Sequence, residues 1–136
     1  MVYLTRRERF NAAHKLWVKE WSEEENFAVF GKCANKNWHG HNYELFVTVK
    51  GQPDPHTGFI MDVKKLGTLI KEKIVNKVDH SNLNLDVDFL PENIQPTTEN
   101  LVIHFWKELE PEITGCQLHC IRLHETENIY AEYFGE

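Results

Sequence analysis

The clearest strand in the sequence lies at residues 42–50, which read NYELFVTVK. Side chains of successive strand residues point to opposite faces. One face of this strand would carry Tyr43, Leu45, Val47 and Val49, and the other Glu44, Phe46, Thr48 and Lys50. This alternation predicts a strand with one face buried against a core.

Further elements are predicted on either side of this strand. A strand is expected at residues 2–14, and a hairpin at residues 116–125 and 129–134. Ser22 followed by Glu25 forms a capping-box pattern, which predicts a short helix within residues 19–30. Residues 59–61 are compatible with a further strand.

Two longer helices are predicted in the second half of the chain. Asp62 stands at an N-cap position, and apolar residues follow it at helical spacing as far as Ile74. The second helix is expected from Thr98 to about Leu109, and Pro111 stops it. Helices grouped between pairs of strands favour an α+β fold, with the helices on one face of an antiparallel sheet. So small a sheet has two exposed edges, which favours oligomerisation.

Length and composition restrict the class of protein. The chain has 136 residues and a formal net charge of −6, and no repeat or linker divides it, so one domain spanning residues 1–136 is expected. An acidic chain without a basic run disfavours general nucleic-acid binding. No apolar stretch approaches a membrane span, and Arg6 to Arg9 stand where a signal peptide would need its apolar core. Three cysteines without a CxxC pair favour a reduced, cytoplasmic protein.

Histidines at the start of the strand suggest a metal site. His39 and His41 are two residues apart, so their imidazoles share one face. His14 ends the first strand, and pairing of the two strands would bring it beside them. Three histidines and an open position are typical of catalytic zinc. Two alternatives are ordinary surface histidines and a structural zinc site with Cys33 as fourth ligand.

Other residues could carry chemistry. Cys33 lies in a polar loop between Lys32 and Lys36, and nearby cations favour the thiolate form of a cysteine. Asp79 precedes His80, and a carboxylate can fix the tautomer of an imidazole. Glu125 ends a predicted strand and could accept paired N–H donors from a planar ligand. Residues 96–100, PTTEN, form a helix start whose free N–H groups and hydroxyls could face a ligand.

Motifs along nearly the whole chain resemble the family of the 6-pyruvoyl-tetrahydropterin and 6-carboxytetrahydropterin synthases. They are FNAAHKL at 10–16, EENFAVFGKC at 24–33, HGHNY at 39–43, DPHTGFIMD at 54–62, VDHSNLN at 78–84, PTTEN at 96–100 and ETENIYAEYFGE at 125–136. Their order and separations make the resemblance specific.

The resemblance implies a fold and an assembly. The family fold is the tunnelling fold, or T-fold, a four-stranded antiparallel sheet with two helices on one face. It assembles as a homohexamer, a dimer of trimers, with active sites between subunits.

The resemblance also implies a zinc-dependent, phosphate-eliminating carbon–oxygen lyase. Such an enzyme converts 7,8-dihydroneopterin triphosphate to 6-pyruvoyl-tetrahydropterin. The implied residue roles are zinc ligands His14, His39 and His41; a general base, Cys33; an acid/base pair, Asp79 and His80; a pterin anchor, Glu125; and pocket residues Thr97, Thr98 and Glu99.

Two alternatives stay open. A 6-carboxytetrahydropterin synthase of queuosine biosynthesis uses the same substrate and zinc. That branch usually places cysteine three residues before HGH, whereas five residues separate Cys33 from His39 here, as in the pyruvoyl-forming branch. Outside the class, the chain could be a non-catalytic, zinc-stabilised ligand-binding module.

Overall fold

The computed structural model describes residues 1–136 and is built around two long antiparallel strands, β1 (Val2–His14) and β2 (His39–Gly51). The two strands pair along their whole lengths, from Val2 opposite Gly51 to His14 opposite His39. The predicted face of β2 is the buried one: Leu45, Val47 and Val49 have no exposed surface. The alternation in the sequence therefore predicted both the strand and its core face.

The sheet has five strands in the order β3-β1-β2-β4-β5. The predicted C-terminal hairpin is confirmed as β4 (Gln117–Thr126) and β5 (Ile129–Tyr133). The implied count of four is corrected by β3 (Ser81–Asn82), which pairs in parallel with Ala12 and Ala13 of β1. Two residues are too short to leave a periodic signal in a sequence.

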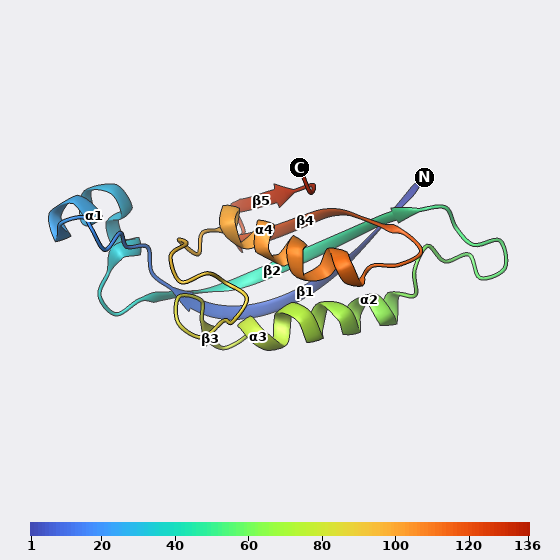
Figure 1. Ribbon diagram of the computed structural model, residues 1–136, viewed down its shortest axis with the longest axis horizontal. Coiled ribbons are helices and arrows are strands. Elements are labelled where there is room, and N and C mark those ends of the chain that lie inside the picture. The colour runs from blue at the N-terminus through green and yellow to red at the C-terminus, as the bar shows by residue number, and fades with distance from the viewer.

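The helices cover one face of this sheet. α2 (Val63–Ile70), a turn of π-helix η2 (Lys71–Val75) and α3 (Asn76–Val78) follow one another without a break, and α4 (Thr98–Leu109) lies over β4 and β5. Figure 1 shows this arrangement. Asp62 caps α2 as predicted, because its carboxylate accepts the Lys64 N–H. Residues 59–61 form no strand, so that expectation was wrong: Phe59 donates from its N–H to Thr57 and accepts from the Asp54 N–H within a local turn.

One end of the molecule extends beyond the sheet. Residues 15–38 leave β1, form α1 (Glu23–Phe30) and the 3₁₀ turn η1 (Gly31–Ala34), and return to β2 (Figure 1). Ser22 caps α1 through the Glu25 N–H, as the capping box predicted. This excursion carries Cys33 at the end of the sheet where β1 finishes and β2 begins.

The core lies between the helices and the sheet. α4 contributes Leu101, Phe105 and Leu109, none of which is exposed. The other face of the sheet has no helix over it and carries polar residues such as Arg9, Asn11 and Glu44. A short η3 turn (Glu110–Glu112) follows α4. None of the helices has the length and apolar character needed to cross a membrane.

Candidate metal centre and adjoining acid/base pair

The pairing of β1 and β2 brings three histidines together. His14 is opposite His39, and His41 is opposite Ala12, two residues before His14. All three side chains therefore lie on the helix-covered face, at the end of the core. The ring centroids of His14 lie 4.5 Å from His39 and 5.1 Å from His41. The predicted histidine cluster is thus present in a single chain.

Glu125 joins this cluster from β4. Its Oε1 atom lies 3.2 Å from Nε2 of His14 and 3.1 Å from Nε2 of His41. One potential ligand atom from each of the four residues, the three histidines and Glu125, lies within 4.8 Å of the others. Cys33 does not belong to this group, so the carboxylate is the additional potential ligand here.

The tautomer of His14 is fixed by the backbone. Its Nδ1 lies 2.8 Å from the carbonyl oxygen of Pro96, and a carbonyl can only accept, so Nδ1 carries the proton. In the neutral ring, Nε2 then presents a lone pair to Glu125. Two acceptors at 3.2 Å repel each other unless a proton or a metal ion lies between them.

The remaining imidazole nitrogens support a cation. Nε2 of His14 and His41 and both ring nitrogens of His39 are buried without a hydrogen-bond partner. Unpartnered buried polar atoms are rare and need an explanation, of which a bound ion is one. A zinc ion bound by imidazoles, with one ring fixed by a backbone carbonyl, would account for them. The residues therefore fit the metal that the sequence suggested.

Burial favours the neutral form of His39 and His41, beside the Glu125 carboxylate. It lowers the pKa of His39, and the neighbouring His14 and His41 lower it further. Burial also lowers the pKa of His41, against the Glu125 carboxylate, which raises it. The contact with His14 lowers the pKa of Glu125, against burial, which raises it. Neutral imidazoles and an ionised carboxylate are the forms that bind a divalent metal.

Asp79 and His80 form a contact of their own at the edge of β1. Oδ2 of Asp79 lies 2.9 Å from Nδ1 of His80, so the two adjacent side chains are in contact. His80 has a positive φ of 59°, which turns the chain sharply after α3. The backbone of Asn11 holds both residues, because its N–H donates to Asp79 Oδ1 at 2.9 Å and its carbonyl accepts the His80 N–H at 2.6 Å.

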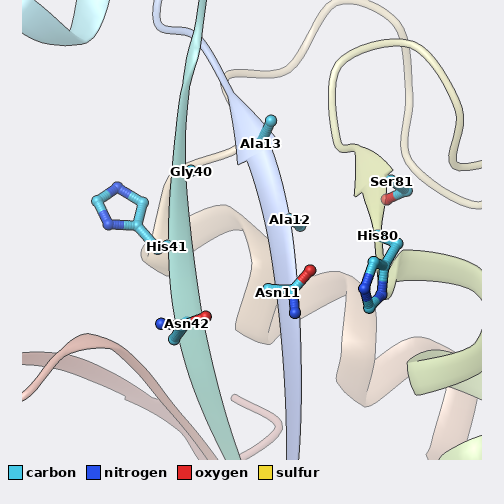
Figure 2. Close-up of a pocket in the computed structure, with 8 residues that line it drawn as sticks. All are labelled: Asn11, Ala12, Ala13, Gly40, His41, Asn42, His80 and Ser81. Carbon is cyan, nitrogen blue, oxygen red and sulfur yellow. The ribbon is translucent and has the colours of Figure 1, made fainter.

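The pair and the histidine cluster lie on different sides of the β1–β2 strands. In Figure 2 the ring of His41 projects from the side of β2 away from β1, whereas His80 lies beyond β1. The side chain of His80 is 76% exposed and borders an open hollow of about 410 Å³, which residues of both strands line, His41 among them. Within one chain, His80 therefore faces solvent rather than the cluster.

We expect Asp79→Asn to make the free energy of unfolding depend less on pH under acidic conditions. The Asn11 N–H lowers the pKa of Asp79 below its usual 3.8, so the stabilisation is present above that value and is lost as pH falls through the folded-state pKa. Because the carboxylate is about one-third exposed, the loss at pH 7 should stay below about 1 kcal/mol. Urea unfolding at pH 7 and in steps below pH 4 measures it. Asp88→Asn, at an exposed position, is the control, and an equal loss at every pH would contradict the expectation.

The segment before α4 lies directly behind the cluster. The Pro96 carbonyl that fixes His14 is followed by Thr97, whose hydroxyl caps α4 by accepting the Asn100 N–H at 3.3 Å. Thr98 is buried, and Glu99 is exposed. The sequence predicted this helix start, but not that the Pro96 carbonyl just before it would orient a histidine.

Cys33 is held near the end of β1 by the backbone. Its carbonyl accepts the Leu16 N–H at 2.9 Å, two residues after His14, and its side chain is partly exposed. The flanking Lys32 and Lys36 are exposed. The thiol is thus accessible near the cluster without being one of the grouped ligands.

Comparisons with known proteins agree on one family. The family model described as 6-pyruvoyl tetrahydropterin synthase matches residues 3–136. The 6-pyruvoyl tetrahydrobiopterin synthase of Dictyostelium discoideum is 43% identical over 135 residues, covering 99% of this chain and 97% of that protein. The human protein of that name is 40% identical over 133 residues, covering 98% and 91%. The structure of Caenorhabditis elegans 6-pyruvoyl tetrahydropterin synthase superposes with a TM-score of 0.91 at 34% identity, covering 99% and 96%.

Proposed function

The chain belongs to the 6-pyruvoyl tetrahydropterin synthase family, and from this premise we propose that it converts 7,8-dihydroneopterin triphosphate to 6-pyruvoyl-tetrahydropterin. The reaction eliminates triphosphate and needs no external reductant, because the side-chain hydroxyls are oxidised while the ring is reduced. Residues 1–136 act as one T-fold domain with this lyase activity, on the route to tetrahydrobiopterin-type pterins. The convergence of three imidazoles beside Glu125 is the observation that carries the proposal.

The proposed metal is zinc, held by His14, His39 and His41. The support is the set of unpartnered ring nitrogens and the carbonyl that fixes the His14 tautomer. When bound, zinc supplies Lewis-acid stabilisation of the negative charge that develops on a substrate oxygen as a neighbouring carbon loses a proton. His14 is buried and His39 and His41 are partly buried, which limits the access of water on that side of the site.

Cys33 is the proposed general base, and Asp79 with His80 the proposed acid/base pair. The partly exposed thiol can approach a ligand that lies over the cluster, and would remove a carbon-bound proton as thiolate. Asp79 accepts from Nδ1 of His80, which leaves the lone pair of Nε2 free to take and return a proton.

The pterin ring is proposed to bind beside the cluster, with Glu125 as its anchor and Thr97, Thr98 and Glu99 lining its pocket. Pro96 supports this position, because its carbonyl joins the segment to His14. Glu125 presents a carboxylate that can accept paired N–H groups of a pterin.

The proposed assembly is a homohexamer, a dimer of trimers, with active sites between subunits. Its support is the separation of His80 from the histidine cluster, since a second copy could bring the two halves together. The outer edge of β5 has no strand partner, and the outer edge of β1 has none beyond the short pairing with β3, as expected of sheets that join into a ring. All three cysteines are free, in keeping with the proposed cytoplasmic location.

The product distinguishes this proposal from its alternatives. We expect the zinc-loaded protein to form 6-pyruvoyl-tetrahydropterin and one triphosphate from each 7,8-dihydroneopterin triphosphate, as measured by mass spectrometry under anaerobic conditions. A carboxy product would instead indicate a 6-carboxytetrahydropterin synthase, which the relatives named above do not favour. Binding of the pterin without any product would indicate a non-catalytic module.

A further inference from the structure

The hydroxyl group of Tyr43 is enclosed without a hydrogen-bond partner. Tyr43 is 1% exposed, and its hydroxyl is one of the buried polar atoms that no neighbour satisfies. A buried tyrosine hydroxyl usually has a partner, and leaving it unpaired costs stability. Phenylalanine would fill the same space without this cost, so the hydroxyl needs an explanation.

The ring of Tyr43 is fixed beside the histidine cluster. It stacks on Phe10 with centroids 4.7 Å apart and planes inclined by 12°. It also lies edge-on to His41, at 5.7 Å, because residues two apart share a face of β2. The position of the ring, and hence of the hydroxyl, is therefore set by packing that does not depend on the hydroxyl.

Glu125 is the acceptor available to this donor. Tyr43 lies opposite Glu125 when the antiparallel β2–β4 register, with Glu44 opposite His124, is continued by one residue. Side chains at such cross-strand positions are neighbours on one face of the sheet. Oε1 of Glu125 contacts His14 and His41, where a bound cation would compete for the histidine lone pairs. The carboxylate would then lie beside the cation, and its remaining lone pairs can accept a hydrogen bond from the phenol.

We propose that Tyr43 is a positioning residue for the metal centre: its hydroxyl donates to the Glu125 carboxylate when the metal is bound and holds that carboxylate beside the histidines. The inference rests on the metal site of the proposed function. A hydrogen bond of this kind orients a carboxylate at a metal site, and loss of such a partner costs roughly 10–100-fold in metal affinity.

Zinc affinity, measured by competition with a chromophoric chelator, tests the proposal with Tyr43→Phe. This variant keeps the stacked ring and removes only the oxygen. We expect zinc to bind about 10-fold more weakly or worse, while urea unfolding with excess chelator shows no loss of metal-free stability, since an unpaired hydroxyl has been removed. Tyr133→Phe is the control, because that hydroxyl bonds the Glu136 carbonyl, outside the cluster.

A second background identifies Glu125 as the mediator. In Glu125→Gln, the further change Tyr43→Phe should cost much less zinc affinity than it does in the wild type, because the charged acceptor is gone. Equal zinc affinity of wild type and Tyr43→Phe would overturn the inference about Tyr43 but not the metal site. The same holds if Tyr43→Phe costs as much zinc affinity in Glu125→Gln as in the wild type. Failure of the wild type to bind zinc would overturn the metal site of the proposed function and the inference with it.

Discussion

Replacing His39 with alanine is expected to abolish both zinc binding and turnover. Both ring nitrogens of His39 are buried without a partner, so the metal is the interaction that explains this side chain. Loss of a direct ligand should weaken zinc binding by more than the roughly 10–100-fold that an outer hydrogen-bonding partner is worth. Because bound zinc supplies several kcal/mol of charge stabilisation, turnover should fall by about 10³-fold or more.

Zinc per chain and product formation are measured together for this variant. His56→Ala is the matched control, because the His56 side chain is 92% exposed in the β2–α2 connection and lies outside the cluster. It should keep zinc and turnover. His39→Ala should also stay folded without metal, since it relieves two unpartnered polar atoms at the end of the core. A His39→Ala variant that is fully active would show that the zinc mechanism is wrong.

The histidine cluster could be predicted because each of its members lies on a strand with a readable register. His39 and His41 share a face by their spacing, and pairing of the first two strands places His14 beside His39. Glu125 was predicted as a ligand-facing carboxylate, but its contact with His14 and His41 depends on the alignment of β4 with β2. A shift in that alignment lies between Thr48 and Val49, which no sequence pattern revealed.

The backbone contacts around the site could not be predicted from residue types. Asn11 holds Asp79 and His80 through its N–H and C=O groups, which every residue except proline possesses. Pro96 fixes His14 through its carbonyl, and because every residue has a carbonyl, nothing in the sequence indicated this contact. The short strand β3 is also a product of main-chain contacts, since it forms where the chain after His80 continues along β1. Side-chain chemistry was therefore predictable, whereas its orientation by main-chain groups was not.

Replacing Cys33 with alanine is expected to leave zinc bound and to remove turnover. The cysteine is outside the group of four potential ligands, and the carboxylate of Glu125 lies beside the histidines in its place. Its proposed task is proton removal, for which a positioned general base typically contributes about 10²–10⁴-fold. Zinc stoichiometry and unfolding should match the wild type, while product formation falls by that factor. The result separates a catalytic cysteine from a structural ligand, because a Cys-His₃ structural site would lose metal and fold together.

Cys116→Ala is the matched control for this experiment. Cys116 is partly buried beside Gly51, at the opposite end of β2 from the histidines, so its loss should leave turnover unchanged. Cys33→Ser adds a graded test, since a serine hydroxyl has nearly the same shape but is a much poorer source of an anion at neutral pH. If Cys33→Ser turns over like the wild type, the thiolate is not the base. If Cys33→Ala loses zinc and unfolds while Cys116→Ala does neither, Cys33 is a structural ligand and its assignment as the general base is wrong.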